Sequence, residues 1–239
     1  MSEIFDRMEL VFCDTEQEIP ETYDYLNKIE VFLDKKITRL KPQKSFNHLM
    51  ETLNFLPSYK NRWCTPLLKT KSMNEYIKKL RNKDDSSIIY LYIGIRADEF
   101  FRTKSAGKNS LLKEVFPFVD NNIYKNDVFN ILNNKGIGIP DYYKWRKRSG
   151  CYFCFYQSCF DWIQLYENHP DLYYKAMEYE YNDCAKIKNG RMGFNMKFAL
   201  KDLIKPENIR LIKEKERKKT VNNKNFVLFT KYLKKELSL

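Results

Sequence analysis

Short apolar runs alternate along this chain with longer segments in which apolar residues recur at helical spacing. The short runs predict strands at 8–13, 36–40, 87–93 and 115–119, because each is bounded by polar or turn residues. The longer segments predict helices from Pro20 onward, near 45–55 and 72–83, and at about 124–134, 159–167 and 170–186. Strands separated by helices are typical of a parallel sheet, so the expected fold class is α/β with a Rossmann-like parallel sheet.

Two of the predicted strands end in polar residues. Asp14 and Thr15 follow the first strand, and residues 96–99, Arg-Ala-Asp-Glu, follow the third. Ligands bind beyond the carboxyl ends of the strands in open parallel sheets, so a ligand site is expected at this edge. Asp14 could accept a hydrogen bond from a nucleotide hydroxyl or hold Mg²⁺, or it could cap the helix that follows.

The chain has 239 residues, of which 43% are hydrophobic. These values predict one globular domain, with or without a small appendage, and exclude a disordered chain. No uninterrupted apolar run approaches ~18 residues, so no membrane partner is expected. The first residues lack the basic and apolar regions of a secretory signal, and a cytoplasmic, reducing location is expected.

Charge is distributed unevenly along the chain. Residues 1–34 carry ten acids and two bases, residues 205–239 carry eleven bases and four acids, and the total is +12. A net charge of this size favours an anionic partner such as a nucleotide, nucleic acid or acidic protein. A solvated lysine-rich surface is the alternative.

Three of the six cysteines fall within nine residues, as Cys151-x2-Cys154-x4-Cys159. This density favours metal or cluster ligation, and the alternative is that small apolar cysteines fill a core. With Cys64 they make a set of four thiolates, which suits an iron–sulfur cluster or zinc. Cys184 could replace Cys159 as the fourth ligand, whereas Cys13 lies in a strand and is expected to be structural.

Four motifs occur in order along the chain: residues 10–22, LVFCDTEQEIPET; residues 62–65, RWCT, with Lys69; residues 93–99, IGIRADE, with Arg102; and residues 136–154, which include Gly-Ile, Pro140, Tyr143 and Gly-Cys-x2-Cys. In this order they resemble phosphoadenosine phosphosulfate reductase-like proteins, over about residues 8 to 180. The chain also resembles bacterial and phage members of this group, including the sulfur-transfer subunit of DNA phosphorothioation systems.

The resemblance implies a fold of the adenine nucleotide alpha hydrolase type. It also implies binding of ATP or phosphoadenosine phosphosulfate, with or without Mg²⁺, and a role in sulfur transfer for which nucleic acid is one candidate acceptor. Sulfur-transferring relatives carry iron–sulfur clusters, which favours a cluster over zinc. The nucleotide-binding residues implied are Asp14, Thr15, Glu18, Lys69, Arg96, Glu99 and Arg102.

Two features of the family are missing from their usual places. The pyrophosphate-binding loop, S-G-G-x-D-S, should precede the first strand seen here, and residues 105–110 match it only superficially. A missing N-terminal segment, a second chain that supplies the loop, or loss of catalysis would each explain this. The E-C-G-x-H tail of assimilatory reductases is also absent, so no catalytic residue is assigned.

Several residue types keep two interpretations. Arg96 and Arg102 could bind phosphate or sulfate, or pair with Asp98 and Glu99 at the surface. Lys69 could meet a phosphate or be solvated. Aromatic side chains interleave with bases between 142 and 160 and could stack nucleobases or pack in a core.

The expected organisation has three parts: an α/β nucleotide-binding core at 1–120, a helical part with the cysteine site at 121–204, and a basic C-terminal extension at 205–239. Within the extension, the charged stretch 205–225 is linker-like. Two function classes follow. One is an enzyme, complete or split, that binds an adenine nucleotide and transfers sulfur. The other is a non-catalytic protein that keeps the fold and binds nucleic acid or a partner.

Overall fold

The computed structural model describes residues 3–82, 87–105, 111–184, 193–194 and 198–220. Contacts divide the chain into two compact units, which are described separately. Unit 1 comprises residues up to 16, 20–45 and 65–143, and unit 2 comprises 17–19, 46–64 and the residues from 144 onward. Both units are therefore built from discontinuous segments, whereas the three parts expected from the sequence are contiguous.

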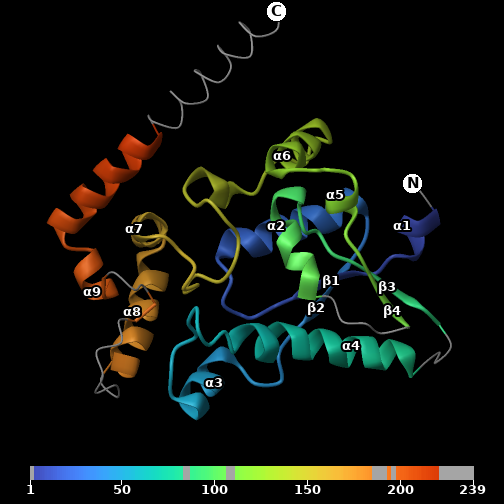
Figure 1. Ribbon diagram of the computed structural model, residues 1–239, viewed down its shortest axis with the longest axis horizontal. Coiled ribbons are helices and arrows are strands. Elements are labelled where there is room, and N and C mark those ends of the chain that lie inside the picture. The colour runs from blue at the N-terminus through green and yellow to red at the C-terminus, as the bar shows by residue number, and fades with distance from the viewer. Residues whose placement is uncertain (1–2, 83–86, 106–110, 185–192, 195–197, 221–239) are drawn as a thin grey trace, which may run out of the picture. The chain divides into compact units, whose positions relative to one another are not determined.

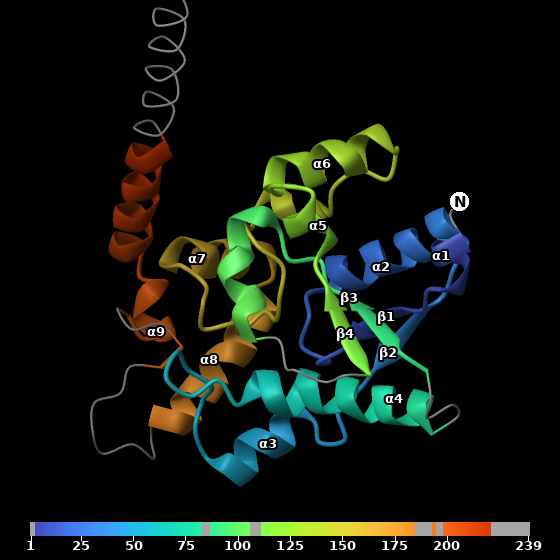
Figure 2. The ribbon, with the colours of Figure 1, turned by 45° about the vertical axis from the view of Figure 1, so that its right-hand side comes forward.

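The described part of unit 1 contains four strands in two parallel pairs (Figure 2). β1 (Leu10–Cys13) pairs with β2 (Ile37–Leu40), and β3 (Ile89–Tyr92) pairs with β4 (Leu112–Val115). The α/β class and the parallel pairing are confirmed. The expected single sheet is not formed in the described part of the chain, because the ladder bonds of β1 and β3 run only to β2 and β4.

Helices connect the strands of unit 1, as parallel pairing requires. α2 begins at Pro20, where the missing amide hydrogen of proline leaves no bond unmade. α4 packs beside β2 (Figure 1). The helical segments of this unit are α1 (Glu3–Arg7), α2 (Pro20–Leu33), a π-helical turn (Pro66–Thr70), α4 (Lys71–Arg81), a 3-10 segment (Ala97–Ser105), α5 (Pro117–Asp120) and α6 (Lys125–Asn134). A 3-10 turn (Asp141–Lys144) follows, and the boundary between the units falls after its third residue, Tyr143.

The predicted strand at 115–119 is wrong. The strand runs over Leu112–Val115, and residues 117–120 form the short helix α5. Pro117 lacks the amide hydrogen that a ladder needs, and its fixed φ suits the first position of a helix. The apolar run therefore spans the end of one element and the start of the next.

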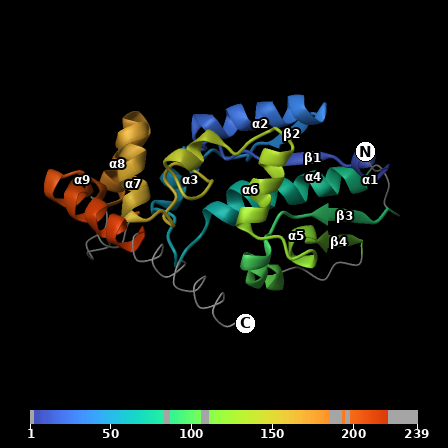
Figure 3. The same cartoon turned by 90° about the horizontal axis from the view of Figure 1, so that it is seen from above.

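Unit 2 is helical. Its elements are α3 (Phe46–Leu53), α7 (Cys159–Asn168), α8 (Pro170–Cys184), α9 (Leu200–Leu203) and a helix over residues 206–220. α7 and α8 lie side by side (Figure 3). Ser158 caps α7, since its Oγ accepts from the Asp161 backbone N–H while its own N–H donates to Asp161 Oδ2. His169 ends α7 and Pro170 opens α8, as their sequence predicts.

The helix over 206–220 corrects the expectation of a linker-like segment. Its side chains pair within the helix, as between Lys218 and Glu214 at 3.0 Å, an i,i+4 pair that stabilises a helix. They also pair with other parts of unit 2, as Lys213 does with Glu167. Alternating charge therefore indicates a surface helix here. Among the described residues, no helix is both long enough and apolar enough to cross a membrane.

Aromatic rings form the core of unit 2. Phe46 is fully buried and stacks on Phe153, with ring centroids 3.9 Å apart, and on Trp63 at 5.3 Å. Phe153 also stacks on Phe194 at 5.8 Å, and the latter contacts Trp162 of α7. The core-packing interpretation of the aromatic segment is therefore right for Phe153.

We expect Phe46→Ala to destabilise unit 2 by about 3–5 kcal/mol, because it removes a buried ring and leaves a cavity between two others. Urea denaturation followed by tryptophan fluorescence measures the loss. Phe32→Ala in α2 is the control, since this ring is 47% exposed and its truncation should change the unfolding free energy little. Equal losses would show that the aromatic stack does not stabilise the fold.

Candidate functional site

The turn that follows β1 holds two buried polar residues, Asp14 and Thr15, which are 5% and 1% exposed. Asp14 Oδ1 accepts hydrogen bonds from the Glu16 backbone N–H and from Tyr23 Oη, each at 2.8 Å. Glu16 has a φ of 60°, a left-handed conformation that this turn imposes. Asp14 lies six residues before Pro20, the first residue of α2, so the helix-cap interpretation is wrong.

Lys69 comes to the end of β1 from the π-helical turn. Its carbonyl accepts from Cys13 Sγ at 3.7 Å. Burial raises the pKa of the Cys13 thiol, and the nearby charge of Lys69 opposes this shift. The sequence predicts that Asp14 and Lys69 share one site, and the structure places Lys69 against Cys13, the residue before Asp14.

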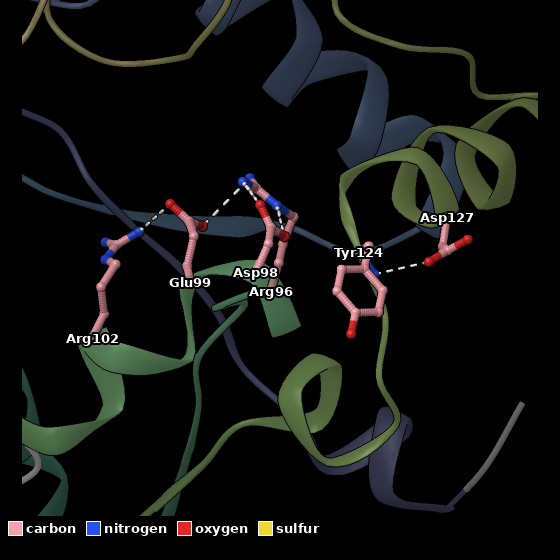
Figure 4. A network of polar contacts seen from close by, with 6 residues as sticks. All are labelled: Arg96, Asp98, Glu99, Arg102, Tyr124 and Asp127. Atoms are coloured by element: carbon pink, nitrogen blue, oxygen red, sulfur yellow. Dashed lines mark hydrogen bonds and ion pairs between the residues drawn. The ribbon is translucent and has the colours of Figure 1, made fainter. Parts of the chain in front are cut away.

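The loop after β3 carries a chain of ion pairs (Figure 4). Arg96 Nε and Nη2 donate to the two carboxylate oxygens of Asp98 at 3.0 and 2.8 Å, and Arg96 Nη1 lies 3.4 Å from Glu99. Arg102 Nη1 donates to the other Glu99 oxygen at 3.1 Å. Arg96, Glu99 and Arg102 are therefore brought together as predicted, in the ion-paired arrangement given as the alternative. A phosphate that binds Arg96 or Arg102 would have to replace a carboxylate as the partner of that arginine.

Tyrosines lie beside both loops in a way that sequence reasoning missed: Tyr23 bonds to Asp14, and Tyr143 lies near Arg96. The hydrogen bond to Asp98 does most to raise the pKa of Arg96, and Tyr143 adds to the effect. Burial is the main cause that raises the pKa of Tyr25, and the nearby Tyr143 raises it further. The Tyr25 hydroxyl donates to Gly138 O at 2.7 Å. Tyr143 thus lies close to both Arg96 and α2. The helical spacing of the apolar residues in α2 places Tyr23 on the apolar face of the helix. That spacing gives no sign of the hydrogen bond from its hydroxyl to Asp14.

Unit 2 contains the cysteine turn and Glu18. Cys154 N–H donates to Cys151 O at 3.2 Å, which closes the turn. Cys151 Sγ contacts Glu18 Oε1 at 3.6 Å, and Tyr152 N–H donates to Gln17 O at 2.9 Å. The structure therefore places Glu18 with a cysteine of unit 2, and its role in nucleotide binding stays a prediction.

A buried arginine holds this turn. Arg146 is 1% exposed, and its guanidinium donates to Gly150 O at 2.9 Å and to Cys151 O at 2.8 Å. Burial lowers the pKa of Arg146, while the nearby Cys154 and Asp161 side chains act in the opposite direction. Gly150 has a φ of 128°, which a residue with a side chain adopts only under strain. The turn is fixed by this conformation and by a cation beside the thiols.

The four predicted ligands Cys64, Cys151, Cys154 and Cys159 are all half-buried residues of unit 2. Within the described residues, however, no three cysteine, histidine or carboxylate side chains are gathered as a metal ion requires. The side chain of Cys184 lies outside the described residues. The described thiols are therefore not already arranged around a metal position, and metal binding stays a prediction.

The family follows from comparison with known proteins. Residues 1–154 match the phosphoadenosine phosphosulfate reductase domain. The chain belongs to this family. Membership implies the adenine nucleotide alpha hydrolase fold, in agreement with the parallel strand pairs. An uncharacterized protein of Methanocaldococcus jannaschii is 26% identical over 191 residues, which cover 74% of this reductase-domain chain and 42% of the relative. The chain thus spans less than half the length of that relative.

We expect Asp98 to titrate below its ordinary pKa, because the hydrogen bond from Arg96 favours its charged form. The Arg96–Asp98 pair therefore stabilises the folded state at pH values above the ordinary pKa of an aspartate. This stabilisation is lost as the pH falls through the lowered pKa of Asp98. Carboxyl NMR titration measures both values. In Arg96→Ala the pKa of Asp98 should rise to its ordinary range.

Asp202 is the internal control for this titration. Its pKa is lowered by Lys205, a residue of unit 2, and should not respond to Arg96→Ala. An unchanged pKa of Asp98 in the variant would contradict the ion-pair geometry of the loop.

Proposed function

We propose that this reductase-domain protein binds an adenine nucleotide, either ATP or phosphoadenosine phosphosulfate, beyond β1 and the loop after β3, and takes part in sulfur transfer. The observation that carries the proposal is the buried Asp14–Thr15 turn at the end of a parallel strand, with Lys69 brought beside it. Parallel α/β folds bind ligands at this edge. The family match supports a nucleotide as the ligand.

The side chains supply complementary contacts in this proposal. Arg96 and Arg102 bind phosphate or sulfate oxygens, since a guanidinium presents two parallel donors. Asp98 and Glu99 hold both cations in place before the ligand arrives. Asp14 accepts a hydrogen bond from a nucleotide hydroxyl or holds Mg²⁺. The hydrogen bond from Tyr23 fixes the position of its carboxylate, and carboxylate oxygens can accept further bonds.

We also propose that Cys64, Cys151, Cys154 and Cys159 supply the ligands of an iron–sulfur cluster, with zinc as the alternative. Support comes from their density in unit 2 and from the cation of Arg146 beside the Cys151–Cys154 turn, which favours thiolates. A cluster would supply sulfur or electron chemistry when bound.

A further chain, or another part of a longer protein, supplies the pyrophosphate-binding loop in this proposal. In the described part of unit 1, β1 and β3 each pair along one edge only, so each has an edge at which another strand can add. The protein is then one part of a split or larger enzyme.

A non-catalytic role, binding nucleic acid or a partner protein, is the second candidate. It is favoured by the bidentate Arg96–Asp98 pair, because an arginine satisfied by its own loop can be purely structural. Nucleotide binding separates the two functions.

We expect Arg96→Ala to weaken binding of ATP and Mg²⁺ by roughly tenfold or more, since a hydrogen bond to a charged group contributes about 1.5–3 kcal/mol. Isothermal titration calorimetry measures the dissociation constant. Arg217→Ala, which removes the same charge from the helix over 206–220, is the matched control. Equal affinities of the two variants would rule out the Arg96 loop as the phosphate site.

We expect protein purified without oxygen to contain iron, with absorbance near ~400 nm, or stoichiometric zinc. Elemental analysis measures both metals. The double variant Cys151→Ser, Cys154→Ser should lose the metal, and Cys13→Ser in β1 should keep it. Metal-free native protein, or loss of metal in the Cys13 variant alone, would contradict the assignment.

A further inference from the structure

We propose that unit 2 binds single-stranded nucleic acid through an exposed surface formed by Tyr59, Arg62, Arg148 and Tyr156, here called the Tyr156 surface. Binding at this surface does not need the nucleotide site. Only the additional idea that the bound strand is the sulfur acceptor rests on the proposed function.

Two arginines share one exposed ring at this surface. The Cζ atoms of Arg62 and Arg148 lie 5.3 and 5.5 Å from the ring centroid of Tyr156. The ring of Tyr59 stands edge-on to it at 6.4 Å. Tyr59 is 73% exposed and Tyr156 is 38% exposed, so both residues present part of their surface to solvent.

Both rings are carried by hydrogen-bonded turns. Gln157 N–H donates to Cys154 O at 3.0 Å, and its buried side-chain amide donates to Tyr152 O at 2.6 Å, which fixes the segment around Tyr156. Ser58 N–H donates to Asn61 O at 2.9 Å, closing the turn that carries Tyr59. The surface is therefore organised before binding, which reduces the entropy cost of ordering it.

The local charge is mainly positive, and Lys147 pairs with Glu216 of the helix over 206–220. Segments 55–64 and 144–160, which form the surface and its supports, contain six bases and no acid. Arg146 is buried, and the other five are exposed: Lys60, Arg62, Lys144, Lys147 and Arg148. Within the described residues Arg148 forms no ion pair. A concentrated positive charge with exposed aromatic rings matches a polyanion that also carries planar bases.

Single-stranded nucleic acid fits this chemistry better than a duplex or an acidic protein. Unpaired bases expose faces that stack on tyrosine, whereas a duplex hides them within its own stack. Guanidinium planes bind phosphate oxygens and also stack on bases. An acidic protein would use the charges and leave the two rings without a role.

Fluorescence anisotropy with a labelled single-stranded DNA of mixed sequence, about 16 nucleotides long, tests the proposal on the full chain without nucleotide. We expect Tyr156→Ala to weaken binding roughly fivefold or more, and Tyr156→Phe to retain it, since stacking on a base needs the ring and not the hydroxyl. Tyr59→Ala should also weaken binding, and its high exposure makes a folding defect an inadequate explanation.

Arg148→Ala should weaken binding and flatten its salt dependence, because one fewer phosphate contact releases fewer counterions. Arg217→Ala is the matched control and should have a smaller effect. Duplex DNA of the same sequence and polyglutamate should compete poorly with the labelled strand.

Three results would overturn the proposal. They are no binding at moderate salt, full affinity of both tyrosine-to-alanine variants, and equal competition by polyglutamate, which would indicate a general anion surface or an acidic protein partner. Arg96→Ala should keep full affinity for the strand. Loss of nucleotide binding in that variant and loss of strand binding in the Tyr156 variant are therefore separate outcomes.

Discussion

The polar turn after β1 constrains both units of this protein. Its first residues, Asp14 and Glu16, belong to unit 1, where the Asp14 carboxylate closes a left-handed turn and accepts from Tyr23. The next two, Gln17 and Glu18, belong to unit 2 and bond to the segment that carries Cys151. Five successive residues thus contribute to the turn after β1 and to the contacts of the cysteine turn. Because most of these polar residues are buried and need hydrogen-bond partners, few substitutions are expected to be tolerated in this segment.

Elements with a clear hydrophobic period were predictable from the sequence. The strand ending at Cys13, the helix that starts at Pro20 and the boundary at His169 and Pro170 follow from local rules that tertiary contacts did not override. The apolar run around Pro117 led to a wrong strand prediction, because hydrophobicity alone does not show that a helix begins at the proline. The charged segment 206–220 misled because charge density resembles a linker until its i,i+4 pairs are considered.

The sequence predicted that the charged residues of the loop after β3 lie together, but it did not identify their partners, and their role in nucleotide binding stays a prediction. Motif order groups Arg96, Glu99 and Arg102, which the structure brings together, but sequence spacing cannot rank a carboxylate against a phosphate as the partner of an arginine. The hydroxyl contact of Tyr23 depends on how α2 lies against the turn after β1, and helical periodicity carries no such information. The same limit applies to Glu18, whose neighbour Cys151 is far away in sequence.

The interleaving of the two units has a consequence for biosynthesis. Phe46 emerges early, but its stacking partner Phe153 follows the whole stretch 65–143 that belongs to unit 1. Domains tend to fold in order as the ribosome releases them, so unit 1 can collapse while this aromatic ring still has no core to enter. The nascent chain would then expose the apolar segment around Phe46 for much of translation. Exposed apolar segments of this kind are bound by chaperones.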